Sequence, residues 1–294
     1  MAEQVLSVPR RESSVLRMLK GMALIRESVV GMIGLALVVI WVFAALFADV
    51  IAPFPPNATI LPMAVPGTAG PDGGVFWLGT DHIGRDILSR IIYGSRRVLI
   101  FAPLATFFAY AVGIPMGLAA GYRRGMTDEI LSFIANIILS FPVLVLYVVI
   151  IATVGASAIN IMVAVTFASA PGIFRIVRGL ALDLRNREYV FAAETRGETP
   201  WRIMMVEILP NARGPLIVDA CLRLGYVIIT IGVLGFLGLG LPPPDPDWGG
   251  MINETRQMAM AFPHMTVFPG IAISSLVLGF NLLADGLREV SLRD

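Results

Sequence analysis

Residues 29–51 read VVGMIGLALVVIWVFAALFADVI, with no charged side chain before Asp49. A helix needs about 20 apolar residues to cross the hydrocarbon core of a membrane. The segment follows a basic arm, residues 1–28, but it is longer than the apolar part of a signal peptide and no clear small-residue cleavage site follows it. We therefore expect a retained transmembrane helix.

Five further apolar segments of similar length lie along the chain. They are residues 98–122, 130–154, 158–177, 215–239 and 266–287. The composition agrees, because 56% of the residues are apolar and 15% are charged, against about 45–50% and about 25% in soluble domains. The sequence predicts an all-α integral membrane protein with six transmembrane helices.

The basic residues are distributed unequally between the two sides. With the N-terminus inside, 16 Arg and Lys residues fall in cytosolic segments and five in outer segments. The positive-inside rule therefore predicts that both termini are cytosolic. The expected organisation is a cytosolic arm, a first span, an outer loop and elbow, a five-helix core that includes a second outer loop, and a cytosolic tail (residues 1–28, 29–51, 52–97, 98–287 with 241–265, and 288–294).

Composition also excludes several classes of protein. The net charge is only +1 and the charges are spread thinly along the chain, which argues against the basic face that a nucleic-acid partner would need. One cysteine and two histidines, Cys221, His82 and His264, do not supply a typical metal site. The single lysine, Lys20, is followed by Gly21, so the chain has no phosphate-binding P-loop. We expect no cofactor and no metal on this chain, and ATP, if it is used, is bound by another polypeptide.

The longest cytosolic connection contains two short helices separated by a sharp break. Gly197 suits the left-handed cap that ends the first helix. Thr199 and Pro200 are a typical start for the second helix, as cap and first residue. Pro210 is expected to stop that helix.

These two helices contain an apolar stripe and a group of small residues. Trp201, Met204, Met205 and Ile208 have the spacing of one apolar stripe. The small residues Ala192, Ala193 and Gly197 leave a surface that another protein could approach closely. From the pattern alone, the segment is either such a docking element or an amphipathic loop on the lipid headgroups.

The pattern Ala192-Ala193-x3-Gly197-x11-Leu209-Pro210 resembles the "EAA" loop of ABC importer permeases. In that family the loop forms a coupling helix that inserts into a cleft of the ATPase subunit. The resemblance implies ATPase-coupling roles over residues 188–210, at Ala192, Ala193, Glu194, Gly197, Glu198, Leu209 and Pro210. Phe191 stands where the family has Glu, and Glu207 where Ile is frequent, so one polar contact to the ATPase is left open.

Three other segments are similar to the C-type permease of the dipeptide/oligopeptide/nickel branch. They are LGTDHIGRDILSRIIYG at residues 78–94, FLGLGLPPPDPDWG at 236–249 and NLLADGLR at 281–288. Phe133, Asn136 and Ile231 depart from that branch, which often has Arg, Asp and Glu at these places.

The resemblance implies the type I importer fold in the bacterial plasma (inner) membrane and alternating access to a pore. This chain would form half of the pore beside a homologous B-type permease. Two ATPase subunits would carry ATP and Mg, so this chain is not itself an enzyme, and an extracytoplasmic binding protein would deliver the solute. A di- or oligopeptide is the expected solute, and nickel chelates, oligosaccharides and opines stay open.

Several residues are candidates for the translocation path or gate. Asp219 and Arg223 lie four residues apart within the fifth span, as a polar patch near the path or a partner, or as a structural ion pair. Phe141 and Pro142 are expected to kink the third span. Trp248 either shapes the outer mouth or is an interfacial anchor.

Charged residues of alternating sign precede the second span. These residues are Asp81, Arg85, Asp86 and Arg90. One interpretation is functional, as an outer gate or a docking ledge for the binding protein. The other is a salt-bridged elbow helix, which the spacing of four residues favours.

A secondary carrier is an alternative function for the whole chain. It would need intramembrane carboxylates, and only Asp219 and Asp285 lie in or near spans.

Overall fold

The computed structural model describes residues 28–70, 73–240, 242 and 244–291. The expected cytosolic arm, apart from Ser28, lies outside these residues, as do residues 292–294 of the expected tail. Two positions of the proline-rich outer loop, 241 and 243, also lie outside them.

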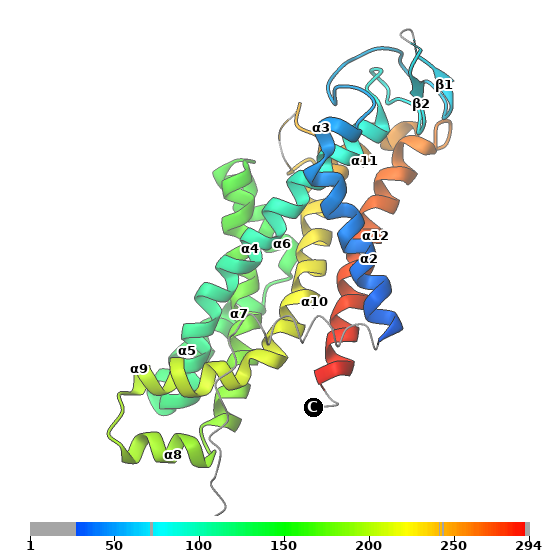
Figure 1. Ribbon diagram of the computed structural model, residues 1–294. Helices are drawn as coiled ribbons and strands as arrows, with labels where there is room; N and C mark the ends of the chain where they lie inside the picture. The colour runs from blue at the N-terminus through cyan, green and yellow to red at the C-terminus, as the bar shows by residue number, and fades with distance from the viewer. Residues whose placement is uncertain (1–27, 71–72, 241, 243, 292–294) are drawn as a thin grey trace, which may run out of the picture.

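The described chain is almost entirely helical (Figure 1). In order, the elements are α2 (Val29–Leu46), α3 (Ala48–Ile51), β1 (Thr68–Ala69), β2 (Val75–Phe76), α4 (Ile87–Arg123), α5 (Gly125–Leu139), α6 (Val143–Val154), α7 (Ala158–Leu184), α8 (Glu188–Thr195), α9 (Pro200–Arg202), the π-helix η2 (Ile203–Ile208), α10 (Leu209–Phe236), α11 (Trp248–Thr255), the 3-10 helix η3 (Arg256–Met258) and α12 (His264–Ser291). The antiparallel hairpin β1–β2, which pairs Thr68 with Phe76, is a small addition to the expected all-α fold.

Among the described residues, five helices are long and apolar enough to cross a membrane, namely α2, α4, α7, the continuous segment α9–η2–α10, and α12. The helices α5 and α6 together make a sixth, but their axes bend by 83°. Pro142 precedes α6 and has no N–H, so the backbone ladder ends there. Five spans are confirmed, and the predicted sixth is present if α5 and α6 form one span that is broken at the expected position.

Two span boundaries differ from the prediction because neighbouring structure extends the helices. Helix α4 begins at Ile87, so the expected elbow runs into the second span without interruption. The prediction that Pro210 stops a helix is wrong, because the chain remains helical from Pro200 to Phe236. In the π-helix the Leu209 N–H bonds to the Met204 carbonyl, five residues back, and this wider turn accommodates a proline without an N–H.

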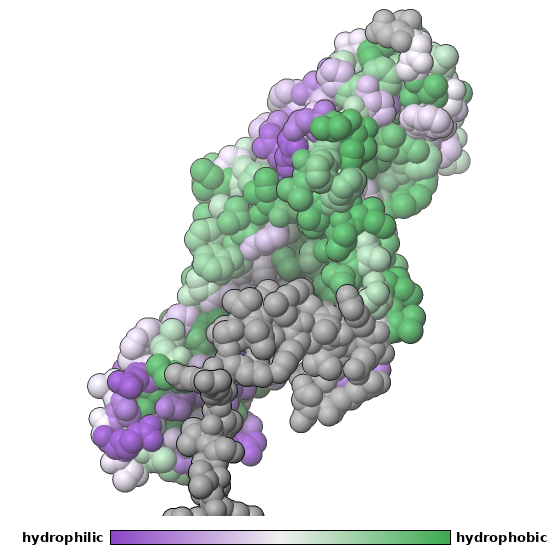
Figure 2. Space-filling model, viewed as in Figure 1, coloured by the Kyte–Doolittle hydropathy of each residue, from purple (hydrophilic) through white to green (hydrophobic). Residues whose placement is uncertain are grey.

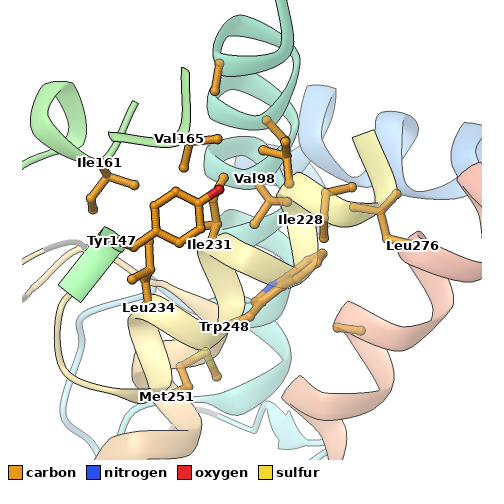
Figure 3. Packing of buried hydrophobic residues seen from close by; sticks show 14 of the residues in the cluster. Val98, Tyr147, Ile161, Val165, Ile228, Ile231, Leu234, Trp248, Met251 and Leu276 are labelled. Carbon is orange, nitrogen blue, oxygen red and sulfur yellow. The ribbon is translucent and has the colours of Figure 1, made fainter. Parts of the chain in front are cut away.

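Buried apolar residues form two main clusters along the same three helices. The outer cluster includes Ala105 of α4, Ala168 of α7 and Val227 of α10, and Figure 3 shows its packing around Trp248 and Tyr147. The inner cluster joins the cytosolic halves of these helices to α8 and η2, through residues such as Leu118, Val177, Ile208 and Leu216. The outer and inner halves of the molecule therefore have separate cores.

Helix α2 packs against α12, at the opposite end of the chain. A Cβ on Gly34 would lie 2.4 Å from the backbone nitrogen of Leu283, and one on Gly286 would lie 2.3 Å from the Cα of Gly31. Such close approach through small residues is how helices associate in lipid, where apolar burial gives little drive. Most of the remaining surface of α2 is exposed and apolar, and Figure 2 shows an apolar middle between two polar ends.

Candidate functional site

Helix α8 lies at one end of the molecule, the end that the distribution of basic residues predicts to be cytosolic, and it has two different faces (Figure 1). Val190 and Ala193 are fully buried and belong to the inner cluster. The opposite face is exposed and follows helical spacing, with Glu188, Phe191, Ala192 and Thr195. The two alanines of the motif therefore differ, because Ala193 anchors the helix and Ala192 faces outward.

The break after α8 has the predicted geometry. Gly197 has a φ of +74° and no atom within 4 Å of a Cβ built on it, so backbone conformation and not space favours glycine here. Thr199 caps the next helix, with its hydroxyl 3.4 Å from the Arg202 nitrogen. These parts of the prediction are confirmed.

The predicted apolar stripe is only partly correct. Met204 and Ile208 are buried, but Trp201 is 57% exposed and does not share their face. The π-helix that begins at Ile203 has more residues per turn than the spacing rule assumes. Extrapolating an α-helical period across this segment therefore misplaces Trp201.

Polar contacts within the chain involve several of the residues that are expected to couple to the ATPase. The Tyr122 hydroxyl donates to the Glu194 carboxylate at 2.9 Å and ties α8 to the end of α4. Glu198 pairs with Arg202 at 3.0 Å. Leu209 is half-buried and Pro210 exposed, and both border an apolar groove between α4 and α10.

The inner cluster makes α8 and η2 one packed body with the ends of the spans. Leu118 of α4, with Val177 and Ala181 of α7, contributes to the same core as Ile208. A displacement of α8 cannot open this close-packed core without a large loss of contacts. The arrangement can therefore transmit a push at α8 to α4, α7 and α10.

Asp219 and Arg223 form the predicted ion pair between the two cores. Arg223 Nε lies 2.7 Å from Asp219 Oδ2, and the Tyr110 hydroxyl of α4 donates to the same carboxylate. Gly172 of α7 leaves space for the guanidinium, since a Cβ there would be 3.1 Å from Arg223 Nη1. The pair is half-buried and joins three helices.

The sequence analysis did not identify Tyr110 and Tyr122 as site residues, because nothing in the sequence around a single tyrosine in an apolar helix indicates which residue it will contact.

Trp248 is 1% exposed and closes the outer end of the bundle. Its indole N–H donates to the Ile91 carbonyl at 2.9 Å, and its ring lies 4.9 Å from that of Trp41. Gly94 makes room for it, because a Cβ there would lie 2.6 Å from the indole nitrogen. The interpretation as a lipid-interface anchor is wrong, because the side chain is buried within the chain.

The four charged residues before the second span are all buried. Residues 81–86 form a turn and not a helix, so the helical spacing argument was wrong there, although Arg85 does pair with Asp81, at 7% and 6% side-chain exposure. Asp86 caps α4 by accepting from the Ser89 N–H at 2.8 Å, and its burial raises the pKa of its carboxyl. Arg90 donates to the Pro56 carbonyl and to Asn57. These side chains hold the outer loop together.

One group of described residues has the spacing of a metal site. Ligand atoms of Asp81, His82 and Glu254 all lie within 4.8 Å of one another. The Arg85 guanidinium pairs with both carboxylates and so occupies the place of a cation. The same contacts tie α11 to the turn before α4.

Comparisons with known proteins show the family of the chain. Residues 113–293 match the family model described as "Binding-protein-dependent transport system inner membrane component". The chain is 40% identical over 213 residues to the glutathione transport system permease protein GsiD of Pectobacterium atrosepticum, which covers 72% of this chain and 71% of the relative. It is 37% identical over 263 residues to the dipeptide transport system permease protein DppC of Haemophilus influenzae, over 88% of each chain.

A solved structure supports the fold. The inward-facing MetNI methionine ABC transporter matches with a TM-score of 0.57 and 21% identity, over 70% of this chain and 96% of that chain. The likeness extends to most of the bundle.

Proposed function

Since this chain belongs to the family of binding-protein-dependent transport system inner membrane components, and is a permease subunit of an ABC importer, we propose that α8 couples it to partner ATPases. The chain spans the membrane and is not an enzyme, so ATP and Mg belong to separate subunits. Two such ATPase subunits, a homologous B-type permease and an extracytoplasmic binding protein complete the proposed assembly.

One observation carries the coupling role. The exposed stripe of α8, with Phe191 and Ala192 at its centre, stands on a base that is buried in the inner cluster. The small Ala192 permits close approach of a partner, and the exposed Phe191 offers it apolar area. Glu194 and Glu198 support this surface through their contacts within the chain.

The mechanism that we propose is alternating access. Closure of the ATPases moves α8, and the inner cluster passes the motion to α4, α7 and α10. Because the outer cluster is a core of its own, the outer mouth need not open and close together with the inner half of the molecule. ATP biases the equilibrium between the two states because the ATPases bind the two arrangements of α8 with different affinity.

We propose a di- or oligopeptide as the solute. Two of the relatives are named for dipeptide and glutathione transport, and glutathione is itself a peptide. Nickel chelates, oligosaccharides and opines are the alternatives for the same assembly.

The test is ATP hydrolysis and uptake by the assembled complex with Gly197→Arg. The bulky charge should block docking, so assembly with the ATPases or hydrolysis stimulated by the binding protein should be lost. Gly197→Asn is the matched control, because Asn tolerates the left-handed conformation and is small. It should retain coupling.

Fully coupled hydrolysis in Gly197→Arg would contradict the proposal. Uptake driven by an ion gradient without ATP would point instead to a secondary carrier. The binding protein that stimulates the wild-type complex would identify the class of solute.

A further inference from the structure

Helix α5 carries a polar stripe along one face. Asp128, Ser132, Asn136 and Ser140 recur at every fourth position, so they project from the same side of the helix. Other faces of α5 are exposed and apolar, with Ile130, Phe133 and Ile137 among them. Within a membrane-spanning segment, a continuous polar stripe faces a water-filled or protein-lined space and not lipid.

Two arginines of α7 lie opposite this stripe and differ in their partners. Arg178 is bound through two nitrogens to the Asp128 carboxylate, with Nη2 2.6 Å from Oδ2. Arg175 donates from Nη2 to the Asn136 amide oxygen at 2.8 Å. Among the described residues, no carboxylate pairs with Arg175, so its charge is not compensated.

These side chains line an open cavity of about 450 Å³, formed by Ser132, Asn136, Phe174, Arg175 and Arg178, and Asn136 and Arg175 are exposed in it. Its size is within the range of small-molecule sites. Arg175 lies 17 residues into α7, about 26 Å along the helix from its outer end at 1.5 Å per residue. The cavity is therefore near the cytosolic side of the hydrocarbon core, which is about 30 Å thick, at the inner end of a route across the membrane.

We propose that this cavity binds the carboxylate of the transported solute on the inner part of its route, with Arg175 as the anion-binding residue. A guanidinium matches the planar geometry of a carboxylate and retains unused N–H donors here. The Asn136 amide oxygen accepts from Arg175, which leaves its NH2 group to donate a further hydrogen bond to the carboxylate, while the Ser132 hydroxyl donates to Asp128 and lines the site. The inference rests on the proposed peptide solute, since every peptide with a free C-terminus carries a carboxylate.

The shape of the site favours a solute over a lipid headgroup. The polar stripe continues from Ser132 to Ser140, about 12 Å along α5. A bound headgroup needs polar groups at one depth only. A solute that crosses the membrane needs them along a path.

The test uses the full complex in vesicles and a thiol probe at the site. Ser132→Cys is introduced with Cys221→Ala, and its reaction rates with an anionic and a cationic methanethiosulfonate reagent are compared. The uncompensated charge of Arg175 should favour the anionic reagent by about tenfold. Asn136→Asp, which supplies a carboxylate to Arg175, and Arg175→Gln should both abolish this preference. Thr153→Cys, exposed near the outer end of α6, is the control that these changes should not affect.

Protection from the anionic reagent identifies the ligand. Alanyl-alanine should slow the reaction at Ser132→Cys, and its C-terminal amide should not. Equal reactivity with the two reagents would overturn the proposal, as would a charge preference without protection by the dipeptide. Protection by phosphatidylglycerol in the vesicles, relative to phosphatidylcholine alone, would assign the cavity to lipid and also overturn it. Because the assay needs no ATP, its failure is distinct from a failure of coupling at α8.

Discussion

At the scale of single residues, glycine is required at two positions for different reasons, one for its backbone conformation and the other for its lack of a side chain. Gly197 has open space around it and is favoured by its positive φ. Gly94 lies within α4, and what it provides is the absence of a side chain beneath Trp248. A substitution at Gly94 therefore acts through the indole that it contacts.

Gly94→Ala should destabilise the outer end of the bundle by about 1–3 kcal/mol, as overpacking does. The added Cβ would lie 2.6 Å from the indole nitrogen and 2.7 Å from Cδ1. Combining it with Trp248→Leu should give less than the sum of the two single effects, because the smaller side chain leaves room. Thermal unfolding of the purified complex measures both, and simple additivity would show that the two residues do not interact.

Asp247 should make the outer segment sensitive to pH. Its burial raises the pKa of its carboxyl to about 6, opposed by the Gly249 and Gly250 amides and by Arg90. An unfolded Asp has a pKa of about 3.9, so the folded state binds the proton more tightly. Stability then falls as the pH rises from about 4 to about 6 and is level above that.

Amide exchange over residues 247–255, corrected for intrinsic rates, should therefore be slower at pH 5 than at pH 7, with a difference of about 1 kcal/mol. Asp247→Asn retains an oxygen that can accept from the Gly250 N–H, so it should remove the pH dependence and keep the helix cap. An unchanged pH dependence in this variant would assign the effect to another group.

At the scale of elements, three helix boundaries that depend on local chemistry could be predicted, whereas the stop expected at Pro210 was overridden by the π-helix before it and boundaries that depend on tertiary contacts could not be predicted. Gly197, the Thr199–Pro200 start and the break at Pro142 follow from backbone conformation and missing donors, and the structure has them. The start of α4 at Ile87 depends on the turn of residues 81–86, which Arg85 fixes through Glu254, 169 residues away. No spacing rule contains that contact, and the same holds for Trp248 with Ile91.

The association of α2 with α12 should depend on its glycines. Gly34→Val would place a side chain 2.4 Å from backbone of α12, which cannot move aside as a side chain could. We expect at least 2 kcal/mol of destabilisation, of the order of other core overpacking, and loss of the Trp41–Ser275 hydrogen bond.

Gly270→Val is the matched control, since no atom lies within 4 Å of a Cβ on this α12 residue. Its thermal unfolding should differ little from that of the wild type. Equal effects of the two substitutions would show that helix propensity, and not helix contact, is responsible.

At the scale of the whole molecule, the two cores are separated by polar and irregular features. The Asp219–Arg223 pair lies between Leu216 of the inner cluster and Val227 of the outer cluster. Pro171 of α7 is close to the same level, next to Gly172, which contacts Arg223. Relative motion of the halves would therefore leave each close-packed core intact.

The orientation of the molecule can be tested by labelling in whole cells. Met260, 98% exposed in the outer loop, should react as Met260→Cys with an impermeant maleimide when Cys221 is replaced by Ala. Met126→Cys, at a residue that is 75% exposed at the start of α5 and away from the exposed face of α8, should react only after the membrane is permeabilised. The opposite pattern would reverse the topology that the positive-inside rule predicts.

The packing of α2 on α12 has a consequence for biosynthesis. Gly34 leaves the ribosome about 250 residues before its partners near Leu283, a delay of about 12–50 s at usual elongation rates. During that time α2 must remain in the bilayer without its partner. Its mean hydropathy of 2.8 and its lack of charges allow this. Helix α4, whose Arg96 donates to the Ala45 carbonyl of α2, is synthesised early, so these two helices can wait together until the last one is synthesised and closes the bundle.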